Sequence, residues 1–169
     1  MRWDRLFGEL EGYAEHVRLE ERDALVTELR EGEWAERSWI DGLPDAEAEI
    51  AVIDVGVLAG RVRMANDLVI HLETTSAMHV IATSAVQWVR GNGRGPGIDR
   101  ESVAAKLGWG PVFREAHDER DVVRLTLAGG SSVEGTVSAA GADFVRIESA
   151  SGQHRDVPTA AIRSAILPK

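Results

Sequence analysis

The sequence contains no cysteine, which excludes disulfide bonds and thiolate metal sites from this protein. Aromatic residues make up only 5% of its 169 positions, and no apolar run approaches the roughly 18 residues of a membrane-spanning helix. The N-terminal residues mix acids with apolar side chains from the start, unlike a secretory signal peptide. Since 44% of the residues are hydrophobic, a buried core is expected. We therefore expect a folded cytoplasmic protein with no membrane contact.

The acidic charge of the chain is concentrated in its first segment. The net charge is −9, and residues 1–48 hold 14 acids and 6 arginines, which leaves 14 acids and 13 bases in residues 49–169. Nonspecific nucleic-acid binding depends on neutralising phosphates with Lys and Arg. The total charge disfavours it, although the near-neutral remainder could hold a local basic patch.

Residues 1–44 are predicted to be an N-terminal helical segment. Apolar side chains recur there at three- and four-residue spacing, as on one face of an amphipathic helix. These positions are Trp3, Leu6, Leu10, Tyr13 and Val17. The pattern allows one long or kinked helix, or two in sequence, ending by Pro44, which cannot continue a helix. The face would either pack on the protein's own β-structure or serve as a surface for a partner.

Two later blocks, residues 45–90 and 121–169, read as five short strands each, because both are rich in Val and Ile and are cut by turn residues. Shifting the first block by 75 positions aligns Gly60 with Gly135, Leu72 with Ile147, Glu73 with Glu148 and His79 with His154. This internal repeat predicts two small β-barrels, with the aligned glycines at the sharpest bends. Residues 91–120 between them form a Gly/Arg-rich linker and a helix expected to begin near Asp99.

The second block carries V-x-L-x-L-x-x-G, then G-x-V-x-x-x-G-x-D-F-V-x-I, then V-P-x-x-A-I-x-x-I, between Val123 and Ile166. This succession resembles the Sm-like fold of the Sm, LSm and bacterial Hfq proteins. With RWDRLFGELE at its start and LGWGPVFREA before the second block, the chain also resembles actinobacterial tandem Sm-like proteins often labelled Fis family transcriptional regulators. The resemblance implies a mostly β protein with two tandem five-stranded Sm-like barrels. It further implies either RNA binding around a ring or assembly through strand pairing.

The Sm resemblance also suggests where a nucleic acid would bind. The family's RNA-contacting Asp or Asn has Asp143 as its nearest match in the second block, and Asn66 or Asp67 in the first. Candidate phosphate contacts are Arg61, Arg63, Arg146 and Arg155. Base stacking needs an aromatic ring or an arginine plane, and the loops beside these residues offer small side chains instead.

Other chemistry has little support in the sequence. GNGRGPG, residues 91–97, lacks the third glycine of a dinucleotide-binding loop and reads as a linker, where Arg90, Arg94 and Arg100 could contact phosphate. The five histidines show no metal-ligand spacing, and no serine lies in a nucleophile motif. We predict a protein that is not an enzyme and needs no cofactor or metal. Its expected function is assembly or adaptor work through self-association or a protein partner, and the alternative is an RNA- or DNA-binding regulator.

Overall fold

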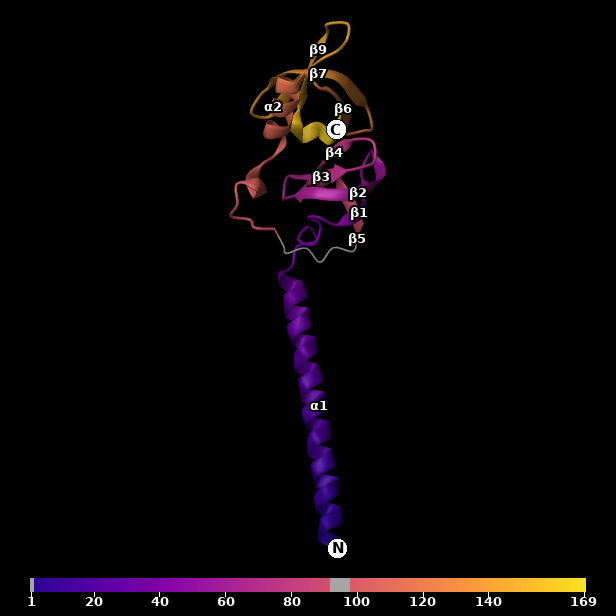
Figure 1. Ribbon diagram of the computed structural model, residues 1–169, viewed down its shortest axis with the longest axis vertical. Coiled ribbons are helices and arrows are strands. Elements are labelled where there is room, and N and C mark those ends of the chain that lie inside the picture. Colours follow the sequence, from indigo (N-terminus) through magenta and orange to yellow (C-terminus); the bar gives the residue numbers. More distant parts are fainter. Residues whose placement is uncertain (1, 92–97) are drawn as a thin grey trace. The chain divides into compact units, whose positions relative to one another are not determined.

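The computed structural model describes the backbone of residues 2–91 and 98–169, and the side chains of residues 18–91 and 98–169 (Figure 1). The chain divides into two compact units, residues 1–38 and residues 39–169. The first unit is helical, and the second contains ten strands and a short α-helix. The expectation of a mostly β protein with helices is confirmed.

Helix α1, Arg2–Glu36, is one continuous helix of 35 residues, which decides between the one- and two-helix alternatives. It ends before Pro44, the latest point expected, and residues 39–45 contain turns instead. Ile40 and Leu43 from this stretch are only 1% and 4% exposed, because both lie in the core of the β-rich unit. The chain must leave the helix to bring both side chains into that core.

The ten strands form one antiparallel sheet in the order β5-β1-β2-β3-β4-β10-β6-β7-β8-β9. The first five strands are β1 (Glu47–Val52), β2 (Gly56–Ala65), β3 (Val69–Glu73), β4 (Met78–Ala82) and β5 (Val86–Gly91). The second five are β6 (Val122–Leu127), β7 (Ser132–Ala140), β8 (Phe144–Glu148), β9 (His154–Pro158) and β10 (Ile162–Leu167). The two sets meet where β4 pairs with β10. Among the described strands, no ladder joins β4 to β5 or β9 to β10, so neither set closes into a fully hydrogen-bonded barrel.

The two halves repeat each other in detail. A 3-10 turn precedes the last strand of each half, at Thr83–Ala85 and Thr159–Ala161. The β2–β3 ladder shifts register between Val62 and Met64, and the β7–β8 ladder shifts at the aligned positions Val137 and Ala139. One detail of the sequence alignment was wrong. Met78 lies opposite Glu73 as His154 lies opposite Glu148, so Met78, and not His79, is the equivalent of His154.

The repeated glycine has a physical explanation in the backbone of the neighbouring strand. A Cβ on Gly60 would lie 2.3 Å from the backbone oxygen of Glu73, and a Cβ on Gly135 would lie 2.2 Å from that of Glu148. Both distances are shorter than any van der Waals contact, so two strands approach too closely there for a side chain. The repeat therefore preserves a close backbone crossing in each half.

The helix expected near Asp99 is not present. The Asp99 side chain accepts a 3.0 Å hydrogen bond from the Glu101 amide, as an N-cap would, but the residues that follow form turns and no α-helix. A 3-10 turn, Ala104–Lys106, follows. Helix α2, Trp109–Glu119, then leads into β6. Residues 92–97, which include most of the GNGRGPG stretch and Arg94, lie outside the described residues.

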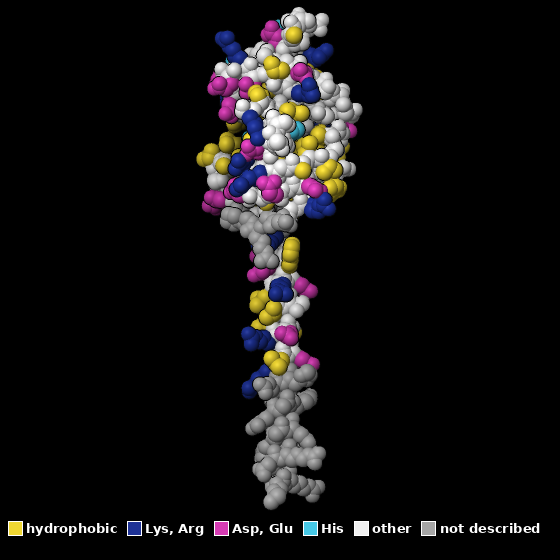
Figure 2. Space-filling model, turned by 45° about the vertical axis from the view of Figure 1, so that its right-hand side comes forward, with side chains coloured by type: hydrophobic (Ala, Val, Ile, Leu, Met, Phe, Trp, Pro, Cys, Tyr) yellow, Lys and Arg dark blue, Asp and Glu magenta, His cyan; other side chains and the backbone are white. Residues whose placement is uncertain are grey.

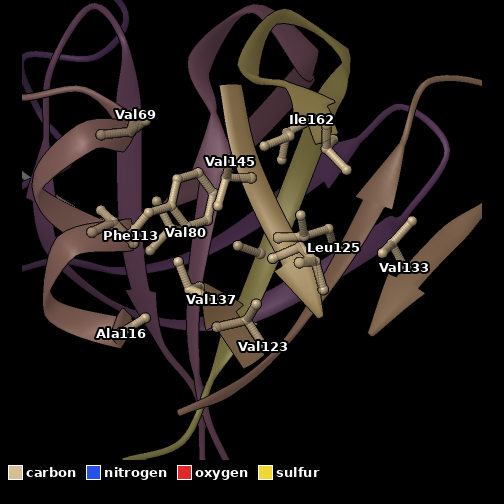
Figure 3. Close-up of a cluster of buried hydrophobic side chains, with 14 residues drawn as sticks. Val69, Val80, Phe113, Ala116, Val123, Leu125, Val133, Val137, Val145 and Ile162 are labelled. Atoms are coloured by element: carbon tan, nitrogen blue, oxygen red, sulfur yellow. The ribbon is translucent and has the colours of Figure 1, made fainter. Parts of the chain in front are cut away.

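Helix α2 joins the two halves of the sheet. Its side chains Val112, Phe113 and Ala116 are buried in one cluster with Val69 and Val80 of the first half and with side chains of the second half (Figure 3). Trp109 stacks on Phe113 with ring centroids 5.5 Å apart, and it packs against the cores of both halves. The ten strands and α2 therefore form one body with a shared interior.

Candidate protein-binding edge and nucleic-acid interface

Three of the four candidate phosphate-contacting arginines lie near carboxylates. Arg146 binds Asp156 through two hydrogen bonds, Nε to Oδ1 at 2.7 Å and Nη2 to Oδ2 at 2.8 Å. That hydrogen bonding holds the pKa of Asp156 below its usual value and raises the pKa of Arg146. Arg63 pairs with Glu73, and Arg61 lies 4.0 Å from Asp45. Each of these positive charges is locally balanced.

The structure does not bring the candidate arginines together. Arg61 and Arg63 are on β2, whereas Arg146 is on β8 and Arg155 is exposed on β9. Five strands, β3, β4, β10, β6 and β7, separate β2 from β8 in the sheet. A single short nucleic-acid segment would therefore not meet all four through one patch.

Of the three candidate polar contacts, Asn66 is the most constrained. It is only 1% exposed. Its Nδ2 donates to the carbonyls of Ala104 and Leu107, both at 2.9 Å, and its Oδ1 accepts from the amides of Leu68 and Val69. Because all of these groups come from the protein itself, Asn66 fastens the linker to the first half of the sheet.

Asp67 and Asp143 are exposed. Asp67 lies 4.0 Å from Arg100, whose guanidinium also pairs with Asp41 at 3.0 Å. The backbone oxygen of Asp143 accepts hydrogen bonds from the amide and hydroxyl of Thr159. The carboxylates thus border ordered loops without forming a shared site with the arginines.

Replacing Asn66 by alanine is expected to lower the free energy of unfolding by about 1–3 kcal/mol, because the buried amide of Val69 and three part-buried groups lose their partner. Asn66→Asp should cost at least as much, since it turns the donor toward two carbonyls into an acceptor. Urea denaturation measures both. Asp67→Ala is the control and should stay within about 0.5 kcal/mol of wild type. A neutral Asn66→Ala would contradict the fastening role.

The β-rich unit has an accessible edge at β5. β5 is an end strand of the sheet, and among the described strands it pairs with β1 alone. A trough of about 440 Å³ runs beside it, lined by Trp39, Leu43, Thr83 and most of β5. Trp39 is 52% exposed and Trp88 is 48% exposed. An unpaired edge strand offers backbone donors and acceptors to another strand, and the two tryptophans add apolar surface beside it.

This edge was missed in the sequence. Trp109 packs against both hydrophobic clusters, whereas Trp39 and Trp88 are exposed beside β5. The signal that could have found Trp88 lies in the internal repeat, where the buried Ser164 of β10 aligns with it. A small buried residue in one copy and a tryptophan in the other indicates that the two strands have different neighbours.

The described part of α1 exposes apolar and charged side chains together (Figure 2). Leu19, Leu25, Leu29 and Trp34 are 53%, 57%, 61% and 73% exposed. Residues 2–36 carry 11 acids and 5 arginines. The predicted partner face lies on the same helix, but the side chains of Trp3, Leu6, Leu10, Tyr13 and Val17 lie outside the described ones.

Two histidines near the middle of the sheet are half-buried. His71 on β3 and His79 on β4 each have one ring nitrogen that is buried without a hydrogen-bond partner among the described residues. Burial lowers the pKa of both, and for His71 the nearby Glu115 partly offsets the effect. Both side chains are therefore neutral in the folded protein at neutral pH.

Stability is expected to fall as the pH drops below about 6.5, the ordinary pKa of histidine. Because the folded-state pKa values are lowered, the unfolded chain binds more protons in this range and is favoured by acidification. The loss of stability that these two histidines cause is absent above pH 6.5. Thermal melts from pH 7.5 down to pH 5 test this, and the H71N/H79N double variant should show a smaller pH dependence than wild type. An unchanged dependence would contradict the assignment to these histidines.

The described residues meet neither the requirements of a metal site nor those of a membrane-spanning helix. No group of three or more His, Asp or Glu side chains there is placed to hold a metal ion. No described helix is both long and apolar enough to cross a membrane. No protein-family model and no curated protein matches the chain.

Proposed function

We propose that this protein is a non-enzymatic adaptor that acts through protein–protein contacts. The observation that carries the proposal is the open β5 edge with the exposed Trp39 and Trp88 beside it. The exposed apolar and acidic side chains of α1 provide a second surface of the same kind.

We further infer that the β-rich unit consists of two Sm-like halves. The support is the succession of glycine, alternating strand and V-P-x-x-A-I motif quoted above, together with the five-strand plan that both halves share. The close backbone crossings at Gly60 and Gly135 support it as well. In this interpretation, the β4–β10 ladder is an assembly contact between two such halves, made permanent by fusion in one chain.

Partner capture tests the adaptor function. The tagged full chain should enrich the same small set of proteins from nuclease-treated extracts of the source organism in repeated experiments. Trp88→Arg should reduce capture at the β5 edge, and the L25K/L29K variant should reduce capture at α1. Val122→Arg is the matched control, since Val122 is 56% exposed and lies on β6, which five strands separate from β5 in the sheet. Equal capture by all variants would overturn the proposal.

The nucleic-acid alternative makes a distinct prediction. Because Arg61, Arg63 and Arg146 face carboxylates and the net charge is −9, we expect no measurable RNA or DNA binding near physiological salt. Fluorescence anisotropy of labelled single strands at low and near-physiological salt measures it. Micromolar or tighter binding that weakens with Arg146→Ala or Arg155→Ala would instead favour a nucleic-acid-binding regulator.

A further inference from the structure

The two copies of the last strand in each half have opposite surroundings. In β10, Ser164 and Ala165 are at most 1% exposed, and β4 pairs along the outer edge of that strand. Among the described strands, none pairs with the corresponding edge of β5, whose Trp88 and Arg90 are exposed. The trough beside β5 is thus the empty equivalent of the slot that β4 fills at β10.

The β4–β10 ladder shows what a strand in this slot looks like. β4 runs antiparallel to β10 and pairs at four positions, with Ser164 opposite Ile81, Ala165 opposite Val80 and Ile166 opposite His79. The strand that fills the slot, MHVIA, is apolar apart from one neutral histidine and contains no proline. By the internal alignment, the same register at β5 places a visiting strand opposite Trp88, Val89 and Arg90.

The protein's own other edge is a poor occupant for this slot. β9, with the sequence HRDVP, is the equivalent of β4 in the second half, and a second copy would offer it head to tail. The β4–β10 register would then place Arg155 opposite Arg90 and Asp156 opposite Val89. Arg90 already pairs with Glu49 of β1, so Arg155 opposite it would place two arginines beside one carboxylate, and Pro158 lacks a backbone donor. Charged residues and proline are devices that block edge-to-edge association.

We propose that β5 binds an extended segment of a partner protein as an eleventh strand, antiparallel to β5. The recognised segment is a stretch of four or five residues rich in Val, Ile and Ala, with no proline and with no positive charge opposite Arg90. Backbone hydrogen bonds to β5 supply binding, and Trp39, Leu43 and Trp88 in the wall of the trough offer apolar contacts to side chains of the segment. The inference rests on the proposed adaptor function and specifies its partner.

The test uses a soluble labelled peptide with the sequence of residues 77–83, AMHVIAT, and the full-length protein. Anisotropy should show saturable binding, and a scrambled peptide and the β9 peptide, QHRDVPT, should bind at least tenfold more weakly. A peptide carrying H79R should also bind more weakly, because its arginine would face Arg90. Trp88→Arg in the protein should reduce affinity at least tenfold, whereas Val122→Arg should not change it.

Methylation of peptide backbone amides tests strand addition without altering the protein. Methylating alternate amides on the edge that faces β5 should abolish binding, and methylating the other alternate set should leave it intact. Binding that tolerates both sets, or that equals the binding of the scrambled peptide, would overturn strand addition. No binding of the AMHVIAT peptide would overturn it as well.

Light scattering of the protein without peptide separates failure of this inference from failure of the adaptor function. A defined oligomer that Trp88→Arg dissociates would show that a second copy occupies the slot. That result would contradict binding of a foreign strand, and it would support self-association as the function. A monomer that binds no peptide would reject the strand site alone, if L25K/L29K still abolishes partner capture. If capture is also insensitive to α1, the adaptor function itself fails.

Discussion

Replacing Phe113 by alanine is expected to lower the free energy of unfolding by about 3–5 kcal/mol, the range for removing a buried aromatic side chain. Phe113 is 1% exposed and contacts a cluster built from both halves of the sheet. Its ring also stacks on Trp109, which packs on both cores, so the cavity would open where the halves meet. For a protein of this size, the melting temperature should fall by roughly 10 °C.

Urea denaturation and thermal melts measure this loss. Phe113→Leu is the matched variant and should cost less than about 1.5 kcal/mol, because it keeps most of the apolar volume. Val103→Ala, at a position that is 77% exposed, should be within about 0.5 kcal/mol of wild type. A loss below 1 kcal/mol for Phe113→Ala would contradict the packing of α2 across the two halves.

Replacing Gly135 by alanine is expected to destabilise the protein by about 3 kcal/mol or more, among the largest single-residue effects. The new Cβ would lie 2.2 Å from the Glu148 oxygen, 2.8 Å from its carbonyl carbon and 2.9 Å from Cγ2 of Ile147. Two of these atoms belong to the backbone of β8, so the β7–β8 ladder must shift to make room. Gly60→Ala should have a comparable effect, because its Cβ would meet the Glu73 oxygen at 2.3 Å.

Gly32→Ala is the contrasting substitution. A Cβ at Gly32 would have no atom within 4 Å, and this residue lies inside α1. Alanine should therefore increase the stability of the helix by up to about 1 kcal/mol. Circular dichroism melts of the three variants measure the comparison. Equal tolerance of alanine at Gly32, Gly60 and Gly135 would contradict the close crossings and leave the repeated glycines unexplained.

The partners of the candidate site residues could not be predicted from the sequence. Arginine positions suggested a phosphate-binding surface, but side-chain partners such as Asp156 for Arg146 lie on neighbouring strands and become visible only in three dimensions. Asn66 looked like a loop residue open to ligands, and its amide instead holds a segment some 40 residues away in sequence. The β5 edge had no local signal, because openness belongs to a strand's neighbours and not to its own residues.

The sequence by itself determined the helical N-terminus, the two five-strand blocks and the paired glycines. The helix and the strands follow from the local periodicity of each segment, and the paired glycines follow from comparing the two blocks in the sequence. Only the tertiary structure decided that β4 covers β10, that α2 packs across both halves and that β5 remains open. Strand pairing and burial depend on contacts between segments far apart in the chain, and the free energy of those contacts is absent from the pattern of any one segment.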